Sequence, residues 1–144
     1  MLYLLPNFLS MSAALLCLLI DDDQDDQEIF ALALEDSGLN MQCVVSNNAS
    51  EALQKLTEDD TFLPNYIFLD LNMPRINGIQ LLTEIKKISR LKHIPVVIYS
   101  TSSHPKDKEV TQKLGASAFI TKPSGIKELS QILKDFFHTH LQPA

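Results

Sequence analysis

Short, unbroken runs of apolar residues alternate along this chain with stretches in which apolar residues recur every three or four positions. Unbroken runs are typical of strands buried on both faces of a sheet, and the longer spacing is typical of helices. The apolar runs predict five strands, at residues 15–20, 41–46, 66–69, 96–99 and 118–121. The stretches after them predict five helices, over residues 24–37, 49–56, 79–88, 106–114 and 126–137.

Strand and helix therefore follow one another five times. This order favours right-handed crossovers and a parallel sheet with helices on both faces, so we predict a doubly wound α/β fold. The boundaries carry signals of their own. Asn48 is a favourable helix N-cap, and Gly38 and Gly115 follow the last turns of two predicted helices.

The chain has 144 residues, which suits one domain with a single core. We predict an N-terminal extension at residues 1–13, the domain at residues 14–138 and a C-terminal tail at residues 139–144. Residues 1–20 carry no charged side chain, but a signal peptide would begin with basic residues, and the end of this run is needed for the first strand. We therefore expect no membrane segment.

The composition excludes some classes of protein. The formal net charge of −6 argues against nucleic-acid binding, because phosphate contacts need clustered Lys and Arg. Cys17 and Cys43 are too few for the disulfide framework of a secreted domain, so we expect reduced, buried thiols in a cytoplasmic protein. His138 and His140 lie at the predicted tail without further candidate ligands, and we expect no metal site there.

Polar residues that end the predicted strands form a chemical pattern. Asp21 and Asp22 follow the first strand, Asp70 the third, Ser100 the fourth and Lys122 the fifth. The carboxyl ends of parallel strands meet at one edge of a sheet, where ligands of such folds bind. We therefore expect three carboxylates, a hydroxyl and an ammonium group to share one shallow site.

These groups fit phosphoryl transfer. Clustered carboxylates repel one another unless a cation lies among them, and their oxygens suit Mg²⁺. A carboxylate can also attack phosphorus and form an acyl phosphate. Lys122 and the hydroxyl of Ser100 would then stabilise charge on the transferred group.

In order and spacing these residues resemble the receiver domain of two-component response regulators. The matching segments are Ile20-Asp21-Asp22, Leu69-Asp70-Leu71-Asn72-Met73-Pro74 with Gly78, Pro95 to Thr101 and Gly115 to Pro123. The resemblance extends over residues 16–137. It implies the CheY-like fold, a flavodoxin-like (βα)5 sandwich whose five-stranded parallel sheet has the order 2-1-3-4-5.

The resemblance also implies a role for each residue of the site. Asp70 would be the phosphoacceptor, taking a phosphoryl group from a histidine kinase or a histidine phosphotransfer protein. Asp22, Asp70 and the backbone carbonyl of Asn72 would bind Mg²⁺, with Asp21 helping through water. Lys122 would pair with the phosphoryl oxygens.

Further residues would carry the response to phosphorylation. Ser100 occupies the switch hydroxyl position. Phe119 occupies the position of an aromatic side chain that moves inward, although an aromatic residue at the end of a buried strand is equally compatible with a plain core role. Thr101 stands where family members usually carry a smaller residue, so access to the site would be narrowed. The Lys122–Pro123 bond would be cis.

We therefore predict a stand-alone response regulator that is phosphorylated on Asp70 and is not a turnover enzyme. We expect no output domain after residue 137, so its output is expected to be contact with a downstream protein. The resemblance places that contact on the surface formed by residues 106–114, 118–121 and 126–137. Pairing of two copies through the same surface stays open.

Three other functions are compatible with parts of this pattern. A phosphatase of the haloacid-dehalogenase type needs a second acid two residues after its nucleophile, where this chain has Asn72. A flavodoxin needs a phosphate loop rich in Ser, Thr and Gly, but Asp21-Asp22-Asp23 would repel phosphate there. A receiver that has lost phosphorylation and acts as a scaffold is favoured only by Thr101.

Overall fold

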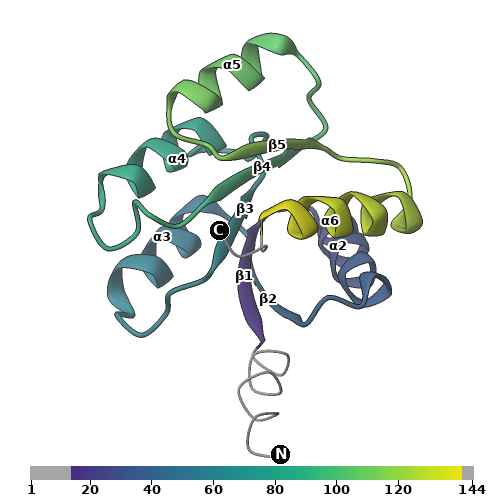
Figure 1. Ribbon diagram of the computed structural model, residues 1–144. Coiled ribbons are helices and arrows are strands. Elements are labelled where there is room, and N and C mark those ends of the chain that lie inside the picture. Colours follow the sequence, from purple (N-terminus) through teal and green to yellow (C-terminus); the bar gives the residue numbers. More distant parts are fainter. Residues whose placement is uncertain (1–13, 141–144) are drawn as a thin grey trace, which may run out of the picture.

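The computed structural model describes residues 14–140. Within this range, strands and helices alternate along the chain (Figure 1). The strands are β1 (Leu15–Ile20), β2 (Met41–Ser46), β3 (Tyr66–Leu69), β4 (Val96–Ser100) and β5 (Ala118–Thr121). The helices are α2 (Gln24–Ser37), α3 (Ala49–Glu58), α4 (Gly78–Lys87), α5 (Pro105–Lys113) and α6 (Ile126–His140).

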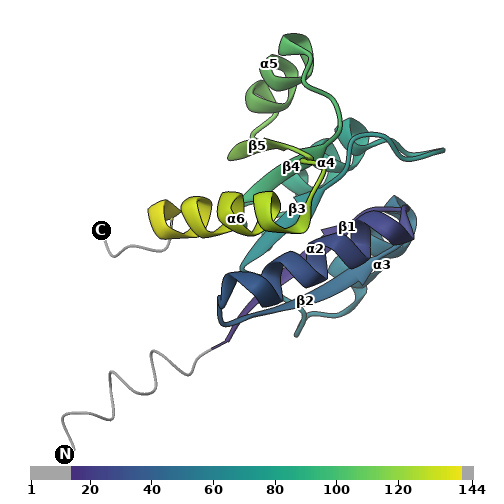
Figure 2. The ribbon, with the colours of Figure 1, turned by 90° about the vertical axis from the view of Figure 1, so that its right-hand side faces the viewer.

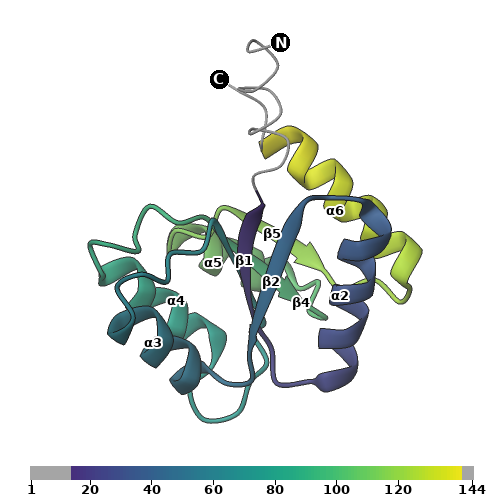
Figure 3. The same ribbon diagram turned by 90° about the horizontal axis from the view of Figure 1, so that it is seen from below.

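The strands form one parallel sheet in the order β2-β1-β3-β4-β5, as predicted. Helices cover both of its faces. Seen from below, α3, α4 and α5 lie on one side of the sheet and α2 and α6 on the other (Figure 3). Figure 2 shows α2 and α6 side by side over their face, where they pack against each other. The fold is the predicted doubly wound α/β sandwich.

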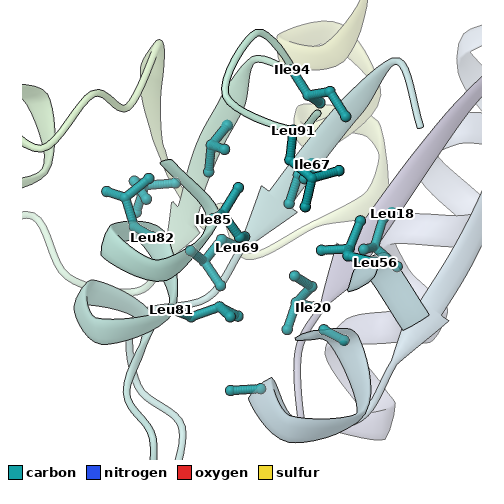
Figure 4. Close-up of a cluster of buried hydrophobic side chains, with 14 of the residues drawn as sticks. Leu18, Ile20, Leu56, Ile67, Leu69, Leu81, Leu82, Ile85, Leu91 and Ile94 are labelled. Atoms are coloured by element: carbon teal, nitrogen blue, oxygen red, sulfur yellow. The ribbon is translucent and has the colours of Figure 1, made fainter. Parts of the chain in front are cut away.

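The core lies in two layers, one on each face of the sheet. Alternate residues of β1 point to opposite faces, so Leu18 and Ile20 join one layer, and Cys17 and Leu19 join the other. Figure 4 shows the first layer, in which Leu18 and Ile20 lie among side chains of α3, β3 and α4. Because both faces are covered, all residues of β3 and β4 are buried, which explains the unbroken apolar runs.

Local side-chain contacts set the helix ends. Asn48 caps α3 by accepting a hydrogen bond from the backbone N–H of Glu51 at 2.7 Å, and Gly38 ends α2 in the left-handed conformation at φ 73°. These two predicted boundary signals are confirmed, and Gly115, which follows the end of α5, also has a positive φ, of 103°. Asn77 and Gln80 form a capping box at the start of α4, which fixes the helix that follows the β3 loop.

The last helix extends beyond its predicted end at residue 137. Thr139 Oγ1 donates to the carbonyl of Asp135 at 3.1 Å, and the His140 ring stacks on Phe136 with centroids 4.0 Å apart. These local contacts continue the helix, so the interpretation of His138 and His140 as a tail is wrong.

Other predictions concern the ends of the chain and the cysteines. The proposed extension at residues 1–13 lies outside the described residues. Over residues 14–140, none of the helices has the length and apolar character needed to span a membrane.

Cys17 and Cys43 are register partners on β1 and β2, and both are free thiols. Cys17 is buried as expected, whereas Cys43, on the edge strand, is only partly buried.

Candidate functional site

The carboxyl ends of the strands bring the predicted polar residues together at one edge of the sheet. Asp21 and Asp70 directly follow the paired strands β1 and β3, while Ser100 ends β4. Lys122 follows β5, and its backbone N–H donates to the carbonyl of Ser100 at 2.8 Å. Asp21, Asp70 and Ser100 are buried. Parallel strand pairing thus assembles residues that are up to 101 positions apart in sequence.

Three carboxylates form the acidic part of the site. One oxygen each from Asp21, Asp22 and Asp70 lies within 4.8 Å of the others. Backbone N–H groups hold two of these side chains: Asp21 Oδ1 accepts from Asp23 at 2.9 Å, and Asp70 Oδ1 accepts from Asn72 at 3.1 Å. Asp22 is exposed and leaves the cluster open to solvent. Convergent carboxylate oxygens with one open side fit a hard divalent cation that retains some water.

Among the described residues, Lys122 supplies the one cationic side chain of this site, and this side chain is nearly enclosed. It is 6% exposed, and its Nζ lies 2.8 Å from Asp21 Oδ2, 2.7 Å from Asp26 Oδ2 and 3.6 Å from Asp70 Oδ2. The ammonium also lies over the ring of Tyr99, 5.2 Å from its centroid. Lys122 therefore meets carboxylates from three segments of the chain and an aromatic face.

The electrostatics of the site reflect this crowding. Burial raises the pKa of the Asp21 and Asp70 carboxyl groups, although Lys122 and backbone donors oppose the shift. Burial alone would lower the pKa of Lys122, but hydrogen bonds to Asp21 and Asp26 raise it overall. Lys122 is therefore protonated, while the two buried acids bear their charge at a cost that a bound cation would relieve.

Asn72 connects the loop after β3 to the end of β4. Its Nδ2 donates to Ser100 Oγ at 3.4 Å and to Thr101 Oγ1 at 3.5 Å, and the backbone N–H of Ser102 also donates to Ser100 Oγ, at 3.3 Å. The exposed Thr101 lines the mouth of a shallow hollow of about 310 Å³ above Asp70. Thr101 therefore shares this hollow with the Asp70 carboxylate.

Asp26 is the residue of the site that the sequence reading missed. Asp26 lies in the first turn of α2, where negative charge is favourable at a helix N-terminus. Its position three residues after the N-cap, Asp23, turns its carboxylate toward the same sheet edge as Asp21. The helical spacing was visible in the sequence, but the partner, Lys122, is 96 residues away.

A family model of the response regulator receiver domain matches residues 17–134. The chain belongs to this family. Rcp1, a response regulator of Synechocystis sp., is 29% identical over 121 residues, which cover 81% of this chain and 82% of Rcp1. A CpxR homolog of Haemophilus influenzae, a transcriptional regulatory protein, is 33% identical over 127 residues, or 88% of this chain. The chain spans about half of that relative's length (52%).

Solved structures share the fold of this receiver domain. The phosphorylated cyanobacterial phytochrome response regulator RcpA superposes with a TM-score of 0.81 at 32% identity, covering 92% of this chain and 97% of RcpA. The Mn²⁺-bound form of Rcp1 superposes with a TM-score of 0.77 at 27% identity, covering 90% and 96%. The predicted CheY-like response regulator receiver fold is therefore confirmed. Receiver domains of this family are signalling modules that bind a divalent metal ion and interact with histidine kinases or phosphotransfer proteins.

Phe119 lies apart from the polar cluster of this receiver domain. Its side chain is half-buried on β5, with Lys108 Nζ 5.7 Å from the ring centroid. The ring lines a separate hollow of about 210 Å³ between α5 and β5, together with Thr111 and Ala116. It also packs against the core layer beneath α3 and α4. This position gives the ring both core contacts and adjacent space.

The prediction of a cis bond between Lys122 and Pro123 is wrong, because every described peptide bond in this structure is trans. The trans form of a bond before proline is favoured by about 0.5–1 kcal/mol. In this trans form the Lys122 N–H pairs with the carbonyl of Ser100, and the ammonium lies in the receiver site.

Proposed function

We propose that this receiver domain accepts a phosphoryl group on Asp70 in the presence of Mg²⁺ and signals through the resulting change in its surface. The observation that carries this proposal is the buried Asp70 carboxylate, which has carboxylate oxygens of Asp21 and Asp22 within 4.8 Å and the Lys122 ammonium 3.6 Å away. A nucleophilic oxygen, a cation site and a fixed positive charge thus lie within reach of one transferred group.

The covalent step follows from this geometry. Asp70 Oδ1 is held by the N–H of Asn72, so Oδ2, on the side of Lys122, is the oxygen proposed to attack phosphorus. A P–O bond forms to Asp70 as the bond from phosphorus to the donor breaks. The electron pair leaves on the imidazole nitrogen of a phosphohistidine, or on the acetate oxygen when acetyl phosphate is the donor. Lys122 donates a hydrogen bond to an oxygen of the phosphoryl group during transfer.

Asp22, Asp70 and the carbonyl of Asn72 are the groups proposed to hold Mg²⁺, with Asp21 acting through water. When bound, Mg²⁺ neutralises part of the charge shared by the carboxylates and the phosphoryl oxygens. The acidic cluster of this chain and the Mn²⁺-bound form of its relative Rcp1 support this assignment.

Phosphorylation is proposed to shift an existing two-state equilibrium rather than to create a new shape. Ser100, now hydrogen-bonded by Asn72 and Ser102, would turn its hydroxyl to a phosphoryl oxygen, and Phe119 would move inward. Thr101 at the mouth would slow the entry of donors and water. A downstream protein would read the surface formed by α5, β5 and α6.

A histidine kinase or histidine phosphotransfer protein is the proposed source of the phosphoryl group. Repeated hydrolysis of substrates is not proposed, because Asn72 has no carboxyl group that could act as acid or base two residues after Asp70. The domain would therefore store a phosphoryl group rather than turn it over as an enzyme.

The proposal is tested by incubating the protein with acetyl phosphate and Mg²⁺ and measuring the intact mass. We expect the wild type to gain one phosphoryl group that hydroxylamine removes, as it does from acyl phosphates, and Asp70→Asn to gain none. Asp25→Asn changes the same charge at an exposed position and is expected to be labelled like the wild type. Equal labelling of wild type and Asp70→Asn would refute the assignment of Asp70.

A further inference from the structure

The proposed phosphoryl transfer leaves one contact of Lys122 unused, its ion pair with Asp26. At 2.7 Å this is the shortest of the three carboxylate contacts of the ammonium. Asp26 is 29% exposed, so its carboxylate reaches from the rim of the site to a lysine that is 6% exposed. An ion pair with one nearly buried partner is screened much less by solvent than a pair on an open surface.

The number of hydrogen-bond donors on Lys122 determines what this ion pair does. A lysine ammonium has three N–H donors and no acceptor. Asp21 and Asp26 each take one, at normal hydrogen-bond distances, while Asp70 Oδ2 at 3.6 Å is too far away to take the third. Neither of these two carboxylates takes the third donor, and the attacking oxygen of Asp70 lies beyond hydrogen-bond distance of the lysine.

Helix α2 holds Asp26 firmly in this place. The backbone N–H of Asp26 donates to the side chain of the N-cap Asp23 at 3.1 Å. The next residue, Gln27, donates from Nε2 to the carbonyl of Asp21 at 2.7 Å and to Asn47 Oδ1 at 2.9 Å. The first turn of α2 is thus tied to the loops after both β1 and β2.

We propose that Asp26 is a positioning residue for phosphoryl transfer, which holds the Lys122 ammonium away from Asp70. This inference rests on the proposed function of the site. With Asp26 in place, Asp70 Oδ2 is free to attack, and the third N–H of Lys122 is ready for the incoming phosphoryl group. Without it, the ammonium closes the remaining distance and pairs with Asp70. The nucleophile must then give up a charge-assisted hydrogen bond before it can react.

The test compares initial phosphorylation rates with acetyl phosphate at saturating Mg²⁺ for the wild type, Asp26→Asn and Asp25→Asn. The small donor removes any contribution from contacts with a kinase. Asparagine keeps the size of Asp26 but not its charge. Asp25 lies in the same helical turn, is exposed and undergoes the same change of charge, so it serves as the matched control.

We expect Asp26→Asn to be phosphorylated about tenfold more slowly, a change in barrier of about 1.4 kcal/mol, and Asp25→Asn to stay within about twofold of the wild type. A second measurement needs no phosphoryl donor. The side-chain ¹⁵N resonance of Lys122 should move in Asp26→Asn and stay unchanged in Asp25→Asn, while backbone amides far from the site keep their wild-type positions.

Two results would overturn the positioning role. If Asp26→Asn reacts as fast as the wild type or faster, Asp26 does not keep Asp70 ready to attack. If both variants slow equally, only the general charge of the helix terminus matters. These results differ from a failure of the proposed function, in which the wild type itself would gain no phosphoryl group and all variants would be equally silent.

Discussion

Asp70 bears its charge in a place where burial works against ionisation. Its pKa is raised because burial, together with the charge of the neighbouring Asp22, outweighs the help of Asn72 and Lys122. The unfolded chain ionises this carboxyl group at lower pH than the folded domain. The folded state therefore binds more protons, and this group makes the metal-free domain less stable as the pH rises through the raised pKa.

Removing the charge should reverse this effect. Asp70→Asn, which keeps the shape of the side chain, is expected to raise the urea midpoint of the metal-free domain at pH 7, and to give little change below the pKa of an unfolded aspartate. Chemical denaturation at a series of pH values, with Asp25→Asn as the control, measures the difference. A lower midpoint for Asp70→Asn at pH 7 would show that the charge of Asp70 is stabilising in this site.

At the scale of elements, the start of α4 lies against the loop that carries Asp70. The N–H of Gly78 donates to the carbonyl of Leu71 at 3.2 Å, and a Cβ at this glycine would lie 2.5 Å from the carbonyl oxygen of Asp70. No real side chain fits at that distance, so any residue but glycine must push the helix or the loop away.

Gly78→Ala is therefore expected to lower the free energy of unfolding by about 1–3 kcal/mol, the usual cost of overpacking, and to weaken Mg²⁺ binding by displacing Asp70. Urea denaturation and a Mg²⁺ titration measure the two effects. Gly125→Ala is the matched control, because a Cβ there meets nothing within 4 Å. Equal stabilities of the two variants would mean that the loop yields without strain.

At the scale of the whole molecule, the fold was predictable because burial on both faces makes each strand an unbroken apolar run. Parallel order then predicted that Asp21, Asp70, Ser100 and Lys122 would meet at one edge, since strand ends are topological positions. The pairing of Asp26 with Lys122 was not predictable in the same way. It depends on the direction of the first turn of α2 relative to the sheet. Neither the sequence around Asp26 nor that around Lys122 contains a pattern that determines this direction.

Two smaller differences between the sequence predictions and the structure have local causes. The helix that reaches His140 is extended by side-chain contacts of its last turn, which lack the apolar spacing used to predict helices. The trans bond before Pro123 contradicts an expectation that came from the resemblance and not from this sequence. The pattern of apolar and polar residues thus predicts the order of strands and helices. The detailed side-chain contacts of the site depend on how distant segments pack together.

The central claim is that Asp70 receives a phosphoryl group and that the domain responds to it. Amide NMR spectra of the wild type and Asp70→Asn, recorded with Mg²⁺ before and after adding beryllofluoride, test it most directly, because beryllofluoride mimics an aspartyl phosphate. We predict that amides near Asp70, Ser100 and Phe119 shift in the wild type alone. An unchanged spectrum of the folded, Mg²⁺-containing wild type would contradict the claim and leave a receiver that acts without phosphorylation.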